Sequence, residues 1–232
     1  MKELVIFGTD DKKTICLVED EELVEKYEED ENNKSIEGNI YIGKVQNVIT
    51  GLQSAFVNIG EKRNAFIHVK DILPKVDIVK NEKLEEKNIN ELIKPGDPII
   101  VEVKKEAVDK KGPRLSTHIT LTNRFVVFMP NSNFITVSQK IENNAERERL
   151  TEIVQKYLPE RSGDIIRTVA ENKPEEELKN DISKTIEKWK AIQNISIDEI
   201  PQKIYDKGGV LKKTIVDLVD NKLDKIVLND KK

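Results

Sequence analysis

The sequence is poor in cysteine and in aromatic residues, and each shortage excludes a class of protein. Cys16 is the only cysteine, which excludes an intramolecular disulfide and a zinc site built from several cysteines. Aromatic residues make up 5% of the chain, so its cores must be aliphatic. No apolar run approaches the roughly 20 residues of a membrane-spanning helix, and no secretory signal precedes the first charged residues. We therefore expect a cytoplasmic protein with no membrane partner.

The charge balance is nearly even and slightly negative. Charged residues make up 35% of the chain, and the formal net charge is −4, which argues against a protein that coats nucleic acid non-specifically. A local basic groove is still compatible with this balance, because salt confines a surface field to roughly 8 Å. Residues 103–114 carry a local excess of positive charge: Lys104, Lys105, Lys110, Lys111 and Arg114 against Glu106 and Asp109. They form either the charged ends of a hairpin or a basic lip that follows phosphates.

Three short strands are predicted in quick succession between residues 38 and 72. Apolar, mostly β-branched residues run through 40–49, 55–59 and 65–69, with turn residues between them. Phe56 and Phe66 lie on the second and third strands. Either both rings are barrel core, the common fate of phenylalanine, or they form a platform on which unpaired bases stack beside lysine and arginine.

The remaining pattern predicts a mixture of strands and helices. Strands are expected over 3–7, 13–18, 99–104, 114–121, 125–129, 134–138, 164–169 and 225–228, and helices over 145–157, after Pro174 and after Gly208–Gly209. The acidic run 19–31 is expected to be a solvated connection with a short strand or turn, and 75–92 a loop carrying a helical turn. The last strand needs a partner for its backbone, and the strands near the other end of the sequence can supply one.

No catalytic constellation is visible. No pattern links His68 or His118 to a nucleophile or a metal, and none of the 43 Asp and Glu residues falls in a recognisable metal-binding spacing. We therefore predict no catalytic residue, no metal ligand and no cofactor in this chain.

The order of residues around the two phenylalanines resembles a known RNA-binding domain. The segments G-N-I-Y-x-G-K-V, L-Q-S-A-F-V-N-I-G and A-F-I-H resemble the S1-type OB-fold of bacterial endoribonucleases of the ribonuclease E/G family. The resemblance extends from M-K-E-L-V-I to I-V-L-N-D, nearly the whole chain. It implies RNA contacts for Phe56 in A-F-V-x-x-G, Phe66 in A-F-I and Lys111 in K-G.

A second group of residues resembles the part of this family that senses a 5′-monophosphorylated RNA end. The segment G-D-I-I-R-T, followed by an acidic helix entry and L-x-x-D-I, carries this resemblance. It implies that Arg167 and Thr168 bind the terminal phosphate, and that Val127 and Asn123 supply apolar and main-chain contacts. Asn123 stands where the family often has glycine, and asparagine tolerates similar backbone angles.

The resemblance implies an α+β fold in which an OB-fold barrel is inserted in a split ribonuclease-H-like subdomain, with a small α/β 5′-sensor subdomain. The expected boundaries are 1–37, 38–121, 122–200 and 201–232. The implied parent is an endoribonuclease that cleaves single-stranded RNA with Mg²⁺, and the resemblance is compatible with a homo-oligomeric parent. This chain matches the RNA-binding N-terminal portion and lacks the catalytic aspartates, so it is expected to bind 5′-monophosphorylated RNA without cutting it. A stand-alone OB-fold module of translation or transcription and a protein-interaction scaffold remain alternatives.

Overall fold

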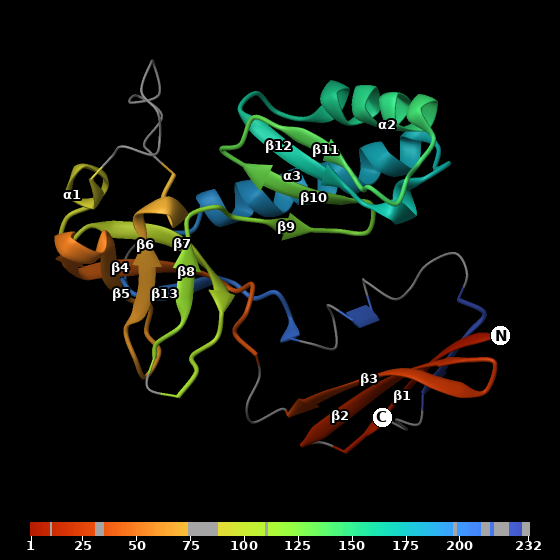
Figure 1. Ribbon diagram of the computed structural model, residues 1–232, viewed down its shortest axis with the longest axis horizontal. Coiled ribbons are helices and arrows are strands. Elements are labelled where there is room, and N and C mark those ends of the chain that lie inside the picture. Colours follow the sequence, from red (N-terminus) through yellow and green to blue (C-terminus); the bar gives the residue numbers. More distant parts are fainter. Residues whose placement is uncertain are drawn as a thin grey trace. The chain divides into compact units, whose positions relative to one another are not determined.

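A computed structural model describes residues 1–9, 11–30, 35–73, 88–109, 111–196, 199–209, 214–215 and 223–228. The chain divides into two compact units (Figure 1). One combines Met1–Ile36 with Lys207–Lys232, and the other is Glu37–Asp206. The two ends of the sequence therefore fold together, and the second unit is inserted between them.

The unit built from both ends contains a four-stranded sheet. Its order is β14-β1-β2-β3, with β1 at Lys2–Gly8, β2 at Lys12–Glu19, β3 at Glu22–Asp30 and β14 at Lys225–Leu228. β14 lies parallel to β1, with Glu3 opposite Lys225 and Ile6 opposite Leu228. The expected partner of the last strand is thus confirmed. Leu4, Ile15 and Leu17 form the buried core beside this sheet.

The acidic run is mostly exposed, as predicted, but its regular structure is longer than the short strand or turn expected there. It forms β3, a nine-residue edge strand that pairs antiparallel with β2. Leu23 and Val24 remain exposed on it, and Lys12 and Lys26 form ion pairs with Glu28. Backbone pairing and neutralising lysines hold this strand without a continuous apolar face, and hydrophobic periodicity cannot detect such a strand.

The inserted unit begins with a closed barrel. Its strands are β4 at Ile40–Ile49, β5 at Ser54–Asn58, β6 at Ala65–His68, β7 at Pro98–Lys105, β8 at Arg114–Ser116 and β13 at Gln202–Tyr205. The order is β13-β4-β5-β6-β8-β7, and pairing of β4 with β7 closes five of them into a barrel. This barrel confirms the predicted α+β fold class with its OB-fold-like component.

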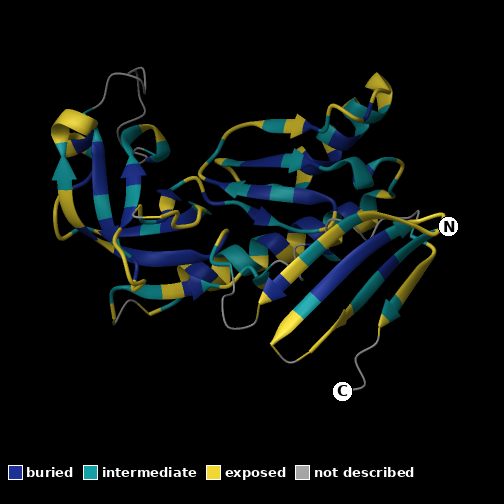
Figure 2. Ribbon diagram, turned by 60° about the horizontal axis from the view of Figure 1, so that its bottom comes forward, coloured by how far each residue is buried: buried dark blue, intermediate teal, exposed yellow. Residues whose placement is uncertain are grey.

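A second sheet with two helices completes the inserted unit. Its order is β11-β12-β10-β9, with β9 at Leu121–Thr122, β10 at Val126–Pro130, β11 at Ile135–Val137 and β12 at Ser162–Ile166. Helices α2, Asn144–Tyr157, and α3, Glu175–Gln193, pack against it. Leu150, Val154, Leu178 and Ile182 from these helices share one core with Val126 and Ile166 of the sheet. Figure 2 colours the chain by burial, with buried residues in dark blue.

The barrel and the second sheet share a further core, so they hold a fixed geometry. Ile40 and Ile42 of β4 are buried in one cluster with Leu121, Phe128 and Ile192. Trp189 packs partly buried against this cluster. Burial of apolar area at such a junction stabilises the arrangement by about 25 cal/mol per Å².

Two predicted elements lie largely outside the described residues. Of the segment 75–92, the structure describes 88–92, where Asn88 caps the single helical turn α1 at Ile89–Leu92. The helix expected after Gly208–Gly209 is described only at residue 209 and at 214–215.

Candidate RNA-binding surface

The two phenylalanines lie side by side on the outer face of the barrel. Phe56 of β5 is directly opposite Phe66 of β6, and both rings are partly exposed. Their strand neighbours Ala55, Val57, Ala65 and Ile67 are fully buried at 0% exposure. Because successive side chains on a strand point to opposite faces, the small and aliphatic neighbours fill the barrel and the rings face outward.

The rings belong to a row that crosses four strands. Asn47 of β4 is opposite Phe56, Phe56 is opposite Phe66, and Phe66 is opposite Arg114 of β8. The two ring centroids are 6.1 Å apart with an interplanar angle of 69°, the edge-to-face arrangement that aromatic pairs favour. One ring edge and one ring face are thus offered in the same row, with polar side chains at both ends.

Lys111 lies beside this row because of the glycine that follows it. A Cβ on Gly112 would lie 2.0 Å from the carbonyl oxygen of Asn64, so only glycine lets the chain pass so close to the β5–β6 connection. The amide of Phe66 donates to the carbonyl of Pro113 at 2.7 Å. Lys111 itself is exposed. The K-G pair therefore brings an exposed lysine to the edge of the platform.

Arg167 follows the last residue of β12 and is held by the β9–β10 turn. Its amide donates to the carbonyl of Phe125 at 2.8 Å. Its Nη1 donates to the carbonyl oxygens of Asn123 and Arg124, at 3.0 and 3.1 Å. These contacts fix the plane of a half-buried guanidinium at the end of the sheet.

Thr168 begins the 3-10 turn Thr168–Ala170 and touches a serine from another strand connection. Its Oγ1 lies 2.8 Å from the Oγ of Ser138. Ser138 also accepts a hydrogen bond from the amide of Lys140, at 3.3 Å. The contact between Thr168 and Ser138 was not predicted, because no local sequence pattern indicates it.

Asn123 and Val127 lie on either side of the same turn. The amide of Asn123 donates to the carbonyl of Val126 at 2.9 Å, closing the turn. Asn123 is not among the residues with positive φ, so asparagine at this position needs no glycine-like backbone. Val127 is half-buried in β10, opposite Thr122 and Ile165. The structure thus brings Asn123 to Arg167 and places Val127 in the neighbouring strand.

The side chain of Asp181, on α3, accepts hydrogen bonds from this turn. The sequence patterns did not predict this contact. Oδ2 of Asp181 accepts the amides of Phe125 and Val126, at 2.9 and 3.3 Å. Burial raises the pKa of Asp181, and the hydrogen bonds from these amides act in the opposite direction. The carboxylate therefore orients the turn whose carbonyls hold Arg167.

A second buried carboxyl lies in the middle of β12. Asp164 is 0% exposed, and neither of its carboxyl oxygens has a hydrogen-bond partner among the residues that the structure describes. Burial raises its pKa to about 8, and the nearby charge of Asp181 adds to the shift. The amide of Val127 lowers this pKa without completing a hydrogen bond. Asp164 is therefore largely protonated at neutral pH.

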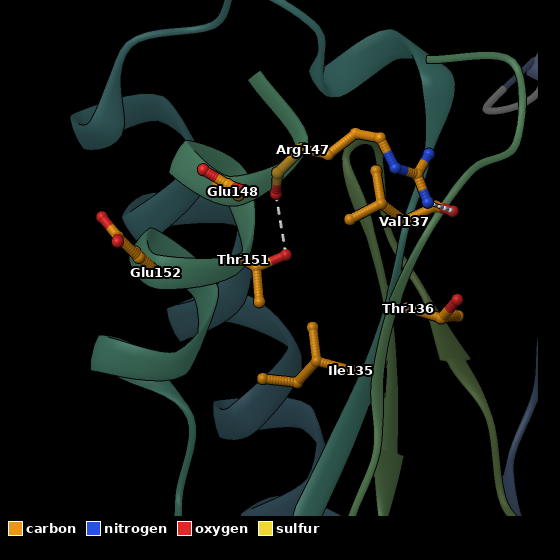
Figure 3. A pocket seen from close by; sticks show the side chains of 7 residues that line it. All are labelled: Ile135, Thr136, Val137, Arg147, Glu148, Thr151 and Glu152. Atoms are coloured by element: carbon orange, nitrogen blue, oxygen red, sulfur yellow. Dashed lines mark hydrogen bonds between the residues drawn. The ribbon is translucent and has the colours of Figure 1, made fainter. Parts of the chain in front are cut away.

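Figure 3 shows a pocket between α2 and the edge strand β11. Its volume is about 370 Å³. None of the residues predicted to bind RNA lines it; the lining residues are Ile135, Thr136, Val137, Arg147, Glu148, Thr151 and Glu152.

The described residues contain neither a metal-binding cluster nor a membrane-spanning helix. In the described ranges, no group of three or more His, Cys, Asp or Glu side chains could hold a metal ion. No helix among these residues is long and apolar enough to cross a membrane.

Comparison with known families defines the class of this protein. Residues 34–118 match the S1 RNA binding domain, and residues 120–232 match the Ribonuclease E/G family. The first match covers the barrel strands β4 to β8, and the second covers the sheet with Arg167. The chain therefore carries a ribonuclease E/G family domain and an S1 RNA-binding domain, as the sequence resemblance predicted.

Individual relatives carry the same family names. The chain is 36% identical over 228 residues to Ribonuclease G of Escherichia coli K12, which covers 97% of this chain and 47% of that protein. It is 38% identical over 233 residues to Ribonuclease G of Haemophilus influenzae, covering 99% of this chain and 48% of that protein. The chain is 37% identical over 189 residues to Ribonuclease E of a Nostoc species, and the match covers 78% of this chain and 27% of that protein. The chain spans about half the length of the curated ribonuclease G relatives it matches.

Proposed function

We propose that this chain is the RNA-binding part of a ribonuclease E/G-type endoribonuclease and binds single-stranded RNA on its barrel. The outward pair Phe56 and Phe66, within the region that matches the S1 domain, carries the proposal. Bases stack on aromatic rings regardless of sequence, at about 1–3 kcal/mol per base. Lys111 at the edge of the platform contacts a phosphate. RNA strands are flexible and charged, and an open row of rings with cations beside it suits them.

We further propose that the β9–β10 turn and the residues after β12 recognise a 5′-monophosphate. Arg167 and Thr168 contact the terminal phosphate, while Asn123 and Val127 contribute main-chain and apolar contacts to the first nucleotide. The oriented guanidinium supports this proposal, because a planar fork of donors suits a phosphate. A terminal monophosphate carries more charge than a diester, so a fixed cation prefers the chain end.

The parent activity is proposed from the family. It is hydrolytic cleavage within single-stranded RNA, for RNA processing and decay, with Mg²⁺ as cofactor and a homo-oligomer as the assembly. The described residues include no cluster that fits a metal, so no step of the reaction is assigned to them. We propose that this chain binds RNA without cleaving it, within a division into a split ribonuclease-H-like part, an OB-fold and a 5′ sensor. Its proposed location is the cytoplasm, where a lone thiol such as Cys16 stays reduced.

A binding titration tests both proposals. Two unstructured RNAs of one sequence, labelled at the 3′ end, carry either a 5′-phosphate or a 5′-hydroxyl, and fluorescence anisotropy measures each affinity. We expect both to bind and the phosphorylated RNA to bind more tightly. Arg167→Ala should remove the difference and leave the affinity for the hydroxyl RNA unchanged.

Each failure has a separate meaning. Equal affinities in the unmodified protein contradict the 5′ sensor and leave the barrel platform standing. Absence of binding to either RNA at low salt contradicts RNA binding and favours a protein-interaction scaffold.

A further inference from the structure

We infer that Arg114 contacts RNA and that its guanidinium forms a third planar surface of the platform, next to Phe66. This inference rests on the proposed RNA binding of the barrel face. It adds a nucleotide position that neither the sequence patterns nor the family matches assign.

The register of the strands places Arg114 in the row of rings. β8 runs parallel to β6 with Arg114 opposite Phe66, and Figure 1 shows β5, β6 and β8 side by side. Adjacent strands lie about 4.8 Å apart. The next residue of β8, Leu115, is 0% exposed, so Arg114 points to the opposite, outer face that carries both rings.

An aspartate orients the guanidinium. Nε and Nη2 of Arg114 both donate to Oδ2 of Asp71, at 3.2 and 2.9 Å. Asp71 ends the 3-10 turn Val69–Asp71 that follows β6. Its carbonyl accepts the amide of Thr117 at 2.8 Å and the hydroxyl of Ser116 at 3.1 Å. The carboxylate is therefore anchored through its own backbone, and it fixes the plane of the guanidinium.

Stability alone does not account for this pair. The side chain of Arg114 is 50% exposed and that of Asp71 is 22% exposed, and ion pairs this accessible to water contribute little to folding. A guanidinium fixed on an open surface, by contrast, can stack on a base and attract the neighbouring phosphate. The platform then offers two rings and one planar cation in line.

The test is an anisotropy titration of the 232-residue chain with an unstructured 5′-hydroxyl RNA, which excludes the 5′-phosphate effect. Arg114→Ala should weaken binding about tenfold, the range of a lost stacking surface. The slope of log affinity against log salt should fall by roughly 0.7, as for one lost phosphate contact. Arg114→Lys keeps the positive charge but lacks the planar guanidinium. It should therefore keep the salt slope of the unmodified protein and recover only part of its RNA affinity.

The control removes the other member of the ion pair. Asp71→Ala breaks the same pair but leaves the guanidinium on the platform, so its affinity should stay within about threefold of the unmodified protein. The inference is overturned if Arg114→Ala binds RNA as tightly as the unmodified protein. It is also overturned if Asp71→Ala weakens binding as much as Arg114→Ala, because the pair then acts only on the fold. Phe56→Ala and Phe66→Ala separate a failure of this inference from a failure of the proposed function. If these variants also leave the RNA affinity unchanged, the barrel face does not bind RNA through its rings.

Discussion

The barrel face and the β9–β10 turn present RNA-binding groups in two different ways. On the barrel, regular strand register aligns side chains, so that Phe56 and Phe66 meet because they are directly opposite. At the turn, the groups come from distant parts of the chain: carbonyls of Asn123 and Arg124, Arg167 after β12 and Asp181 from α3. The first arrangement depends on exposed side chains and the second on buried hydrogen bonds. Substitutions should therefore change binding alone on the barrel, and change binding together with stability at the turn.

The largest expected effect is on the barrel. Replacing both Phe56 and Phe66 by alanine should cost roughly 4 kcal/mol of RNA affinity, because each stacked base contributes about 1–3 kcal/mol. Both rings face outward, so the thermal unfolding midpoint should change little. Anisotropy and a thermal melt of the same variant measure the two effects. A large fall in the midpoint with unchanged affinity would mean that the rings act as core.

At the turn, Asp181→Ala should lower the free energy of unfolding by about 3 kcal/mol, because two buried amides lose a charged acceptor. The turn that holds Arg167 also loses its support, so the preference for 5′-phosphorylated RNA should fall. Urea unfolding and the two-RNA titration measure these effects. Asp181→Asn keeps an acceptor oxygen, so it should retain part of the stability and part of the preference for 5′-phosphorylated RNA. A destabilised variant with undiminished preference would contradict the role of Asp181 in orienting the turn.

Asp164 should make stability depend on pH. Burial raises its pKa from 3.8 to about 8, so between these values the folded form keeps a proton that the unfolded chain has released. Stability should therefore fall as pH rises from about 4 to about 8, and level off above. Asp164→Asn lacks this proton equilibrium, so its stability relative to the unmodified protein should rise by roughly 4 kcal/mol between pH 5 and pH 8.

Urea unfolding of both proteins at the two pH values checks this expectation. A difference that stays the same at both pH values would show that Asp164 ionises normally in the folded state.

The smallest effect is expected for Lys111. Lys111→Ala should reduce the salt slope by roughly 0.7 and lower affinity modestly at low salt. Affinity measured over a series of salt concentrations gives the slope. Lys111→Arg serves as the matched control and should keep it. An unchanged slope in Lys111→Ala would place the lysine outside the path of the RNA.

Sequence reasoning could predict the barrel better than the turn, for physical reasons. Alternation of small buried residues with Phe56 and Phe66 is a local signal, and so is the turn chemistry between the strands. Asp181 contacts Phe125, which is 56 positions away in the sequence, and Ser138 contacts Thr168, which is 30 positions away. No local pattern encodes such contacts. The length of β3 was underestimated because the strand pairs through backbone and lysine–glutamate contacts instead of burying an apolar face. The roles of Phe56, Phe66, Lys111, Arg167, Thr168, Val127 and Asn123 remain predictions.

The central claim is that one unit carries two separable RNA contacts, one for bases within the strand and one for its 5′ phosphate. The most direct test measures the affinities of the unmodified protein, Phe66→Ala and Arg167→Ala for RNAs with a 5′-phosphate and a 5′-hydroxyl. The account predicts that Phe66→Ala weakens both RNAs by the same factor, whereas Arg167→Ala weakens only the phosphorylated one. Equal weakening of both RNAs by Arg167→Ala would contradict it.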